Sequence, residues 1–231
     1  MPSDPVRDPH AQPPPATLRT DYHARLDGID DRLVGAALLV AEAMPGLVRC
    51  LLTADHSCLG AARALAGEVH ERCRQVEEDG FLLIAREGPV SGDLRRLVAL
   101  LRLVHDVERA GRLARHIAEG VERLRVPDLP EPVRRQLEEL AALSIEVFRR
   151  GLDAWRGRDA LAVHELDRRD TQVDTLRTRL LVLAGELERP PAEVVALGLV
   201  GRYLERLADH GMAFAQQVTF AVTGERVDVG R

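Results

Sequence analysis

Four carboxylates near the end of the chain have the spacing of a cation-binding site. Asp170 is followed by Asp174, and Glu205 by Asp209, so each pair is spaced i, i+4. On a helix this spacing places both side chains of a pair on one face, one turn apart. Two negative charges this close repel each other, and each pair therefore needs a nearby positive charge or a proton.

The two pairs are also level with each other if the chain between them forms an antiparallel helical hairpin. The position numbers of Asp170 and Asp209 have the same sum as those of Asp174 and Glu205, which centres the turn between Arg189 and Pro190. Four converging carboxylates must take up protons, attract cations or bind metal. Ligands that are all oxygen favour iron, manganese or another divalent cation over zinc.

A simpler interpretation stays open for this second-half face. Acidic pairs on charged helices are often solvated or paired with arginine, and four arginines lie close in sequence. The candidates are Arg168, Arg169, Arg202 and Arg206.

The corresponding face in the first half has lost most of its acids. If the halves are a repeat and the earlier hairpin turns at Pro89, the equivalent positions are Ala66, His70, Glu108 and Arg112. Arg112 can pair with Glu108 at i, i+4, and a dication beside Arg112 would be repelled. We expect no multinuclear metal site there.

Apolar residues recur at helical spacing along nearly the whole chain, and Gly, Pro and Asp cluster at the breaks. The predicted helices are Leu18–Thr53, His56–Glu87, Ser91–Arg123, Pro132–Arg156, Asp159–Glu188 and Pro191–Thr223. Pro45-Gly46 is expected to kink or split the first of them.

These helices predict an all-α fold of two tandem, pseudo-symmetric three-helix bundles, six long antiparallel helices in all. The predicted boundaries are a disordered tail at 1–16, a first bundle at 17–126, a second bundle at 127–225 and a C-terminal tail at 226–231.

The composition agrees with this fold and excludes several function classes. Hydrophobic residues make up 45% of the chain and aromatic residues 3%, which favours helices packed through aliphatic side chains. The formal charge of -5 is spread evenly, which argues against nucleic-acid binding. Three cysteines without CxxC spacing fit a reducing cytoplasm. The longest uncharged stretch, Gly211–Gly224, is shorter than the ~20 residues of a membrane span, so no direct membrane insertion is expected.

Helical bundles also serve three other functions. A ferritin-like di-iron protein needs Glu-x-x-His steps, and none is present in the sequence. A phosphoacceptor histidine has candidates in His70, His116 and His164. A metal-free interaction module, whose acidic face binds arginines of a partner, would have the same bundles.

Several segments together resemble the PhoU family. Residues 83–95 (LIAREGPVSGDLR) are similar to its hairpin signature LIARQQPVAxDLR, and residues 106–114 (DVERAGRLA) are similar to its DLERIGDLA. Residues 203–210 (YLERLADH) carry a second copy, and residues 18–26 resemble the family's opening LRxxYHxxL. The chain departs from the family at positions 66, 70 and 112, where acidic residues are usual.

The resemblance implies a homodimeric adaptor rather than an enzyme, with paired three-helix bundles and metal clusters on E/DxxxD faces. It implies negative regulation of phosphate uptake and of the phosphate-starvation response, through two partners: the cytoplasmic ATPase subunit of a phosphate transporter and a sensor histidine kinase. Applied to this sequence, it leaves a possible iron, manganese or other divalent cation cluster in the second bundle only.

Overall fold

The computed structural model describes residues 16–227, with side chains from Thr20 onward. The first half contains three long helices, α1 (Ala16–Thr53), α2 (Leu59–Glu87) and α3 (Ser91–Glu119). The second half contains α4 (Glu131–Gly157), α5 (Ala162–Gly185) and α6 (Pro191–Thr223). Short 3₁₀ turns lie at His56–Cys58, Gly120–Glu122 and Val126–Asp128. The expected tails fall almost wholly outside the described residues.

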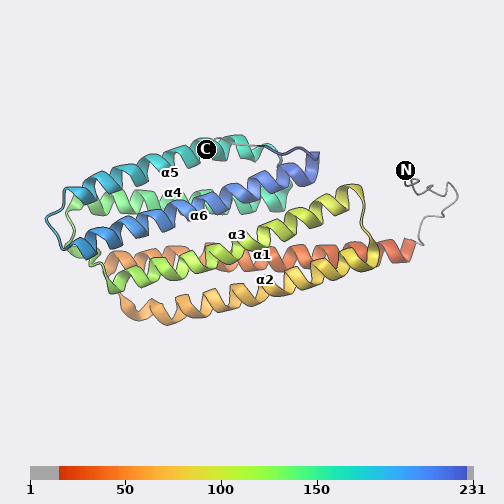
Figure 1. The fold of residues 1–231 in the computed structure, drawn as a ribbon, viewed down its shortest axis with the longest axis horizontal. Helices are drawn as coiled ribbons and strands as arrows, with labels where there is room; N and C mark the ends of the chain where they lie inside the picture. The colour runs from red at the N-terminus through yellow and green to blue at the C-terminus, as the bar shows by residue number, and fades with distance from the viewer. Residues whose placement is uncertain (1–15, 228–231) are drawn as a thin grey trace, which may run out of the picture.

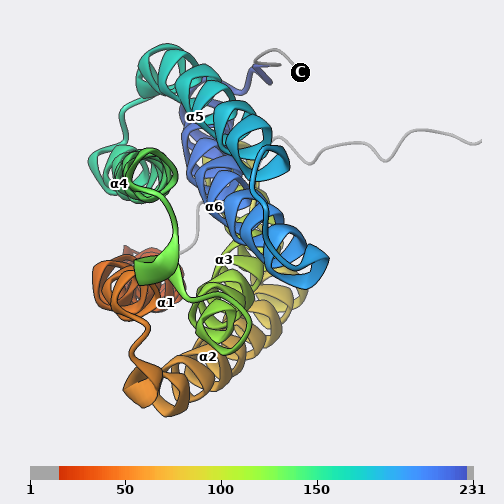
Figure 2. The ribbon, with the colours of Figure 1, turned by 90° about the vertical axis from the view of Figure 1, so that its left-hand side faces the viewer.

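The predicted all-α fold of two three-helix bundles is confirmed. Figures 1 and 2 show α1, α2 and α3 in one bundle and α4, α5 and α6 in the other, with α3 beside α6 and α1 beside α4. The buried apolar side chains form one core cluster that includes residues of all six helices. The proposed division of the chain into separate domains stays a prediction.

The helix ends follow from residues that favour them. Gly88 ends α2 in the left-handed conformation, with φ of 54°, and its N–H donates to the Ile84 carbonyl at 3.1 Å. Pro191 occupies the first turn of α6, where no backbone donor is needed. The sequence therefore sets both hairpin turns locally, which fixes the register of the helices on either side.

Pro45-Gly46 does not split the first helix, because α1 runs through both residues; the expected kink stays a prediction. A proline cannot donate the backbone hydrogen bond that the carbonyl four residues earlier would accept, here that of Ala41. Arg149 of α4 supplies donors instead: its Nη2 lies 2.9 Å and its Nε 3.2 Å from the Ala41 oxygen. A tertiary contact thus satisfies the carbonyl that Pro45 leaves free.

Arg149→Met is expected to cost about 1 kcal/mol of unfolding free energy in the natural background, because the Ala41 carbonyl loses its donors. In the Pro45→Ala background the same change should cost much less, because a backbone N–H is again available there. Urea unfolding of the four proteins of this double-mutant cycle measures the difference. Equal losses in both backgrounds would mean that Arg149 does not compensate for the proline.

The two helices α4 and α6 cross at a pair of glycines. A Cβ placed on Gly151 would lie 2.0 Å from the Gly211 carbonyl oxygen, and one placed on Gly211 would lie 2.6 Å from Phe148 Cα. Backbones can approach this closely only where neither residue has a side chain. This contact brings α6, which carries half of the predicted acidic face, against α4.

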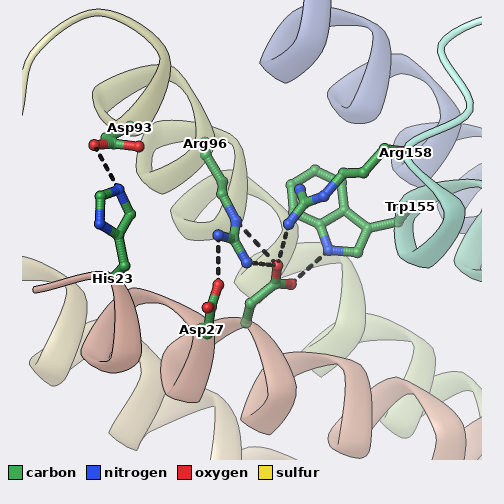
Figure 3. A network of polar contacts seen from close by, with 7 residues as sticks. His23, Asp27, Asp93, Arg96, Trp155 and Arg158 are labelled. Atoms are coloured by element: carbon green, nitrogen blue, oxygen red, sulfur yellow. Dashed lines mark hydrogen bonds and ion pairs between the residues drawn. The ribbon is translucent and has the colours of Figure 1, made fainter. Parts of the chain in front are cut away.

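A buried carboxylate joins the two bundles near the α2–α3 turn (Figure 3). Asp30 of α1 is 6% exposed and accepts hydrogen bonds from Trp155 Nε1 at 2.6 Å and Arg158 Nη2 at 2.7 Å, both donors lying at the end of the second bundle's first helix. From α3, Arg96 donates to Asp30 through Nε at 3.1 Å and through Nη2, and Arg96 Nη1 also donates to Asp27 at 2.7 Å. One carboxylate therefore holds together α1, α3 and α4.

Within α1, the segment Thr20–Thr53 is long and apolar enough to cross a membrane by length and composition alone. Leu26, Leu33 and Val40 are among the apolar residues of this segment that are buried in the protein core, and others, such as Leu38 and Leu39, are partly buried and pack against it. This is the position of a core helix in a folded bundle.

Candidate functional site

The α5–α6 hairpin has the register that the sequence predicts. A Cβ on Gly198 would lie 3.3 Å from Leu181 Cδ2, and one on Gly201 would lie 3.0 Å from Leu180 Cδ2. These contacts fix the register of the hairpin. In this register Asp170 and Asp209 lie at the same height along the two helices. The predicted acidic residues therefore lie along the same stretch of one hairpin.

Asp170 is the carboxylate most affected by this arrangement. Its pKa is raised from 3.8 to about 7, first by partial burial and then by the negative charges of Asp209, Asp174 and Glu205, in that order. Burial and like charges both disfavour the ionised form. The three other predicted residues thus act on Asp170 electrostatically.

Glu205, in contrast, is already paired with arginine side chains of this chain. It is 7% exposed, and Arg202 Nη1 donates to both of its carboxylate oxygens, while Arg177 Nε lies 3.8 Å from Oε2. The pKa of Glu205 is nevertheless raised, chiefly by burial and also by the negative charge of Asp209, although both arginines lower it. Arg202 was among the expected arginine partners; Arg177 of α5 was missed, although it lies only three residues beyond Asp174.

Asp209 and Asp174 remain on the surface. The pKa of Asp209 is raised because the surrounding helices reduce its hydration; His210, Arg202 and Arg206 lower it by a smaller amount. His210 itself is 4% exposed and its Nδ1 lies 2.9 Å from Asp106 Oδ1 of α3. This pair links the acidic hairpin to the first bundle, and sequence reasoning missed it because the two residues are far apart in the chain.

The donor chemistry of this face fits a cation that prefers oxygen ligands. Within residues 16–227, Asp170, Asp174 and Asp209 form no ion pair with an arginine, lysine or histidine, so these carboxylates are free to act as ligands. The carboxylates do not form a coordination site in this conformation. In the described part of the chain, no three His, Cys, Asp or Glu side chains are placed to hold a metal ion. The four-residue metal site stays a prediction.

The equivalent face of the first half is neutralised by its own residues, as expected. His70 Nδ1 of α2 lies 3.1 Å from Glu108 Oε1 of α3, and Arg112 Nη1 donates to the same oxygen at 2.5 Å. The close approach of His70 to Glu108 confirms the predicted register of the α2–α3 hairpin. One carboxylate between an arginine and a histidine has little excess charge to attract a dication.

Asp170→Asn is expected to stabilise the chelator-treated protein by about 1 kcal/mol at about pH 8.5. This free energy is smaller than the full pKa shift would give, because the side chain is partly exposed and solvent screens its charge. Because folding raises the pKa of Asp170, the folded protein holds this proton more tightly between about pH 4 and pH 7. The electrostatic cost of Asp170 is therefore present above pH 7 and disappears as the pH falls towards 4. The gain from the substitution should follow the same course.

Urea unfolding of both proteins across this pH range measures the effect. Glu138→Gln, which removes an exposed carboxylate from α4, is the control and should show no such trend. A stabilisation by Asp170→Asn that does not change with pH would show that charge repulsion is not its cause.

Comparison with known proteins gives consistent matches over most of the chain. The family model described as "PhoU domain" matches residues 33–121 and again residues 137–218, one match in each half. The phosphate-specific transport system accessory protein PhoU homolog 1 of Mycobacterium tuberculosis is 36% identical over 215 residues, covering 90% of this chain and 95% of that protein. The corresponding homolog of Deinococcus radiodurans is 32% identical and covers 90% and 98%.

Solved structures show the same fold. The phosphate transport system regulatory protein PhoU from Streptococcus pneumoniae matches with a TM-score of 0.81 at 22% identity, covering 90% of this chain and 99% of that one. PhoU from Pseudomonas aeruginosa matches with a TM-score of 0.81 at 24% identity, covering 88% and 100%.

Proposed function

Because the chain belongs to the PhoU family, we propose that it is a regulatory adaptor of phosphate homeostasis, which limits phosphate uptake and represses the phosphate-starvation response when phosphate is plentiful. The observation that carries this proposal is the match of the PhoU domain to both halves of the chain. The names of the relatives, accessory proteins of a phosphate-specific transport system, support a role in phosphate transport.

The proposed adaptor is a cytoplasmic homodimer with two partners, the ATPase subunit of a phosphate transporter and a sensor histidine kinase. Its role is to bind them and not to catalyse a reaction. The fold supports such a role, because long helices joined in one core present extended, rigid faces to other proteins.

Deletion of the gene tests the regulatory role. In cells grown with abundant phosphate, the deletion strain is expected to express phosphatase and to take up phosphate faster than the parent, and a plasmid copy of the natural gene should restore repression. Phosphatase activity and phosphate uptake that stay at the parental level in the deletion strain would contradict the proposed function.

We further propose that Asp170, Asp174 and Asp209, with Glu205, bind iron, manganese or another divalent cation in the second bundle. The pKa of Asp170, raised first by burial and then by three neighbouring carboxylates, supports this proposal, because a carboxylate surrounded by like charges gains most from a bound cation. A bound dication would supply positive charge and connect α5 to α6. Glu205 contributes as a ligand only if its carboxylate leaves Arg202 and Arg177.

A metal-free interaction module is the second candidate, and one observation favours it. Glu205 already binds two guanidinium groups of this chain, so the acidic face accepts arginine as a counter-charge. In this alternative, arginines of a partner protein would take the place of the cation on Asp170 and Asp209. Metal content distinguishes the two candidates.

A further inference from the structure

A groove of about 310 Å³ runs between α1 and α2 on the outside of the first bundle, and only these two helices line it. From α1 it receives one helix face, spaced i, i+3, i+4 and i+7. The residues of this face are Arg25, Gly28, Ile29 and Arg32. The groove therefore follows the helix axis for two turns.

The opposite wall comes from α2 with the same spacing: Asp79, Leu82, Leu83 and Arg86. Because the helices are antiparallel, the first residue on one wall lies level with the last residue on the other. The ion pair between Arg32 and Asp79 closes one end in this way. At the other end two arginines, Arg25 and Arg86, face each other across the groove.

The middle of the groove is apolar and open. Leu82 is 49% exposed although it lies between two packed helices, and a Cβ added to Gly28 would meet nothing within 4 Å. Glycine inside a helix costs about 1 kcal/mol relative to alanine, and neither close packing nor a positive φ requires it at this position. Gly28 instead leaves room above the floor formed by Ile29 and Leu83.

The open end of the groove is positive. Arg25 has a partial partner in Glu87, at 3.6 Å, whereas Arg86 forms no ion pair within residues 16–227. This local excess of positive charge occurs in a protein whose formal charge is -5. A ligand that combines apolar groups with a carboxylate would match both parts of the groove.

We propose that this groove binds two turns of an amphipathic helix from a partner protein. Seven residues along α1 separate the level of Arg25 from that of Arg32, which corresponds to about 10 Å. An acidic side chain of the partner faces Arg25 and Arg86, and apolar side chains one and two turns further on pack over Gly28 and against Leu82. This surface goes beyond the proposed function, because it depends neither on metal nor on a particular signalling pathway.

A model peptide tests the proposal directly with the full-length protein. The probe is a fluorescein-labelled helical peptide of about 15 residues, with one glutamate and with leucines three, four and seven residues after it. Fluorescence anisotropy is expected to show saturable binding. Arg86→Glu and Gly28→Leu should each weaken binding at least ~10-fold, the first by reversing the charge and the second by filling the open space.

Matched variants elsewhere serve as controls. Arg179→Glu reverses the charge of an exposed arginine on α5, and Gly67→Leu adds a side chain to an exposed glycine of α2 whose Cβ would also meet open space. Both control variants should leave peptide binding unchanged. Circular dichroism of all four variants should show the helical content of the natural protein. A peptide with lysine in place of the glutamate, or with the same residues scrambled, should bind at least ~10-fold more weakly.

Several results would overturn the proposal. Equal binding of the probe and the scrambled peptide, or undiminished binding by Gly28→Leu, would show that the groove is not the site. If Gly28→Leu dissociates a dimer in sedimentation experiments, the occupant is a second copy of this chain. If Asp4→Asn/Asp8→Asn tightens peptide binding ~10-fold, the chain's own N-terminal segment is the occupant.

Discussion

Gly211→Leu is expected to prevent α4 and α6 from packing as they do in the natural protein, with a loss of more than about 3 kcal/mol of unfolding free energy. The atoms that a side chain at this position would overlap are Phe148 Cα, the Val147 carbonyl oxygen and the Phe148 backbone nitrogen, the nearest at 2.6 Å. Backbone atoms inside a helix cannot move aside as a flexible side chain can. The two helices must therefore separate, which opens the core around Phe148 and Phe214.

Urea unfolding and near-UV circular dichroism measure this effect. Gly67→Ala is the matched control, since Gly67 also lies inside a helix but a Cβ there would meet nothing within 4 Å. The control should be stabilised by about 0.5–1 kcal/mol, because alanine favours the helix. If Gly211→Leu were as stable as the natural protein, the close crossing of α4 and α6 would be wrong.

Asp30→Ala is expected to cost about 3–5 kcal/mol, because it removes a buried carboxylate that is the common acceptor of the buried Trp155, the half-buried Arg96 and the exposed Arg158. Arg96, Trp155 and Arg158 all donate to this one carboxylate, and they come from different bundles. The loss should therefore loosen the contact between the bundles as well as lower the overall stability.

Hydrogen exchange of α1, α3 and the end of α4, together with urea unfolding, measures both effects. Asp31→Ala is the control, since Asp31 is the exposed neighbour of Asp30 and should cost less than about 1 kcal/mol. Similar losses in the two variants would show that the buried cluster does not hold the bundles together.

Local signals in the sequence predicted most of the fold. Gly88 ends α2 and Pro190-Pro191 begins α6 for steric reasons, so the turns and the residues at the same height across each hairpin could be predicted. The contact between His70 and Glu108 and the pairing of Arg112 with Glu108 confirm that reasoning. Some observed helix ends differ from the predicted ones by a few residues. The helix predicted at Asp159–Glu188, for example, begins at Ala162 and ends at Gly185.

Contacts between distant segments could not be predicted in the same way. Nothing near Pro45 in the sequence indicates that Arg149 would bind the Ala41 carbonyl and keep α1 continuous. Spacing placed Glu205 on the acidic face, yet it could not show that Arg177 of the facing helix would reach it. Such contacts depend on how the helices pack, and they decide which carboxylates remain available.

We propose that the acidic face of the second bundle binds a divalent cation and that its counterpart in the first bundle does not. Inductively coupled plasma mass spectrometry of protein purified without chelator tests it. The natural protein is predicted to hold about one or more iron, manganese or other divalent ions per chain. Glu108→Gln should keep them, and Asp170→Asn/Asp209→Asn should lose them. Absence of metal from the natural protein, or loss of metal in Glu108→Gln with retention in the second-bundle variant, would contradict the claim.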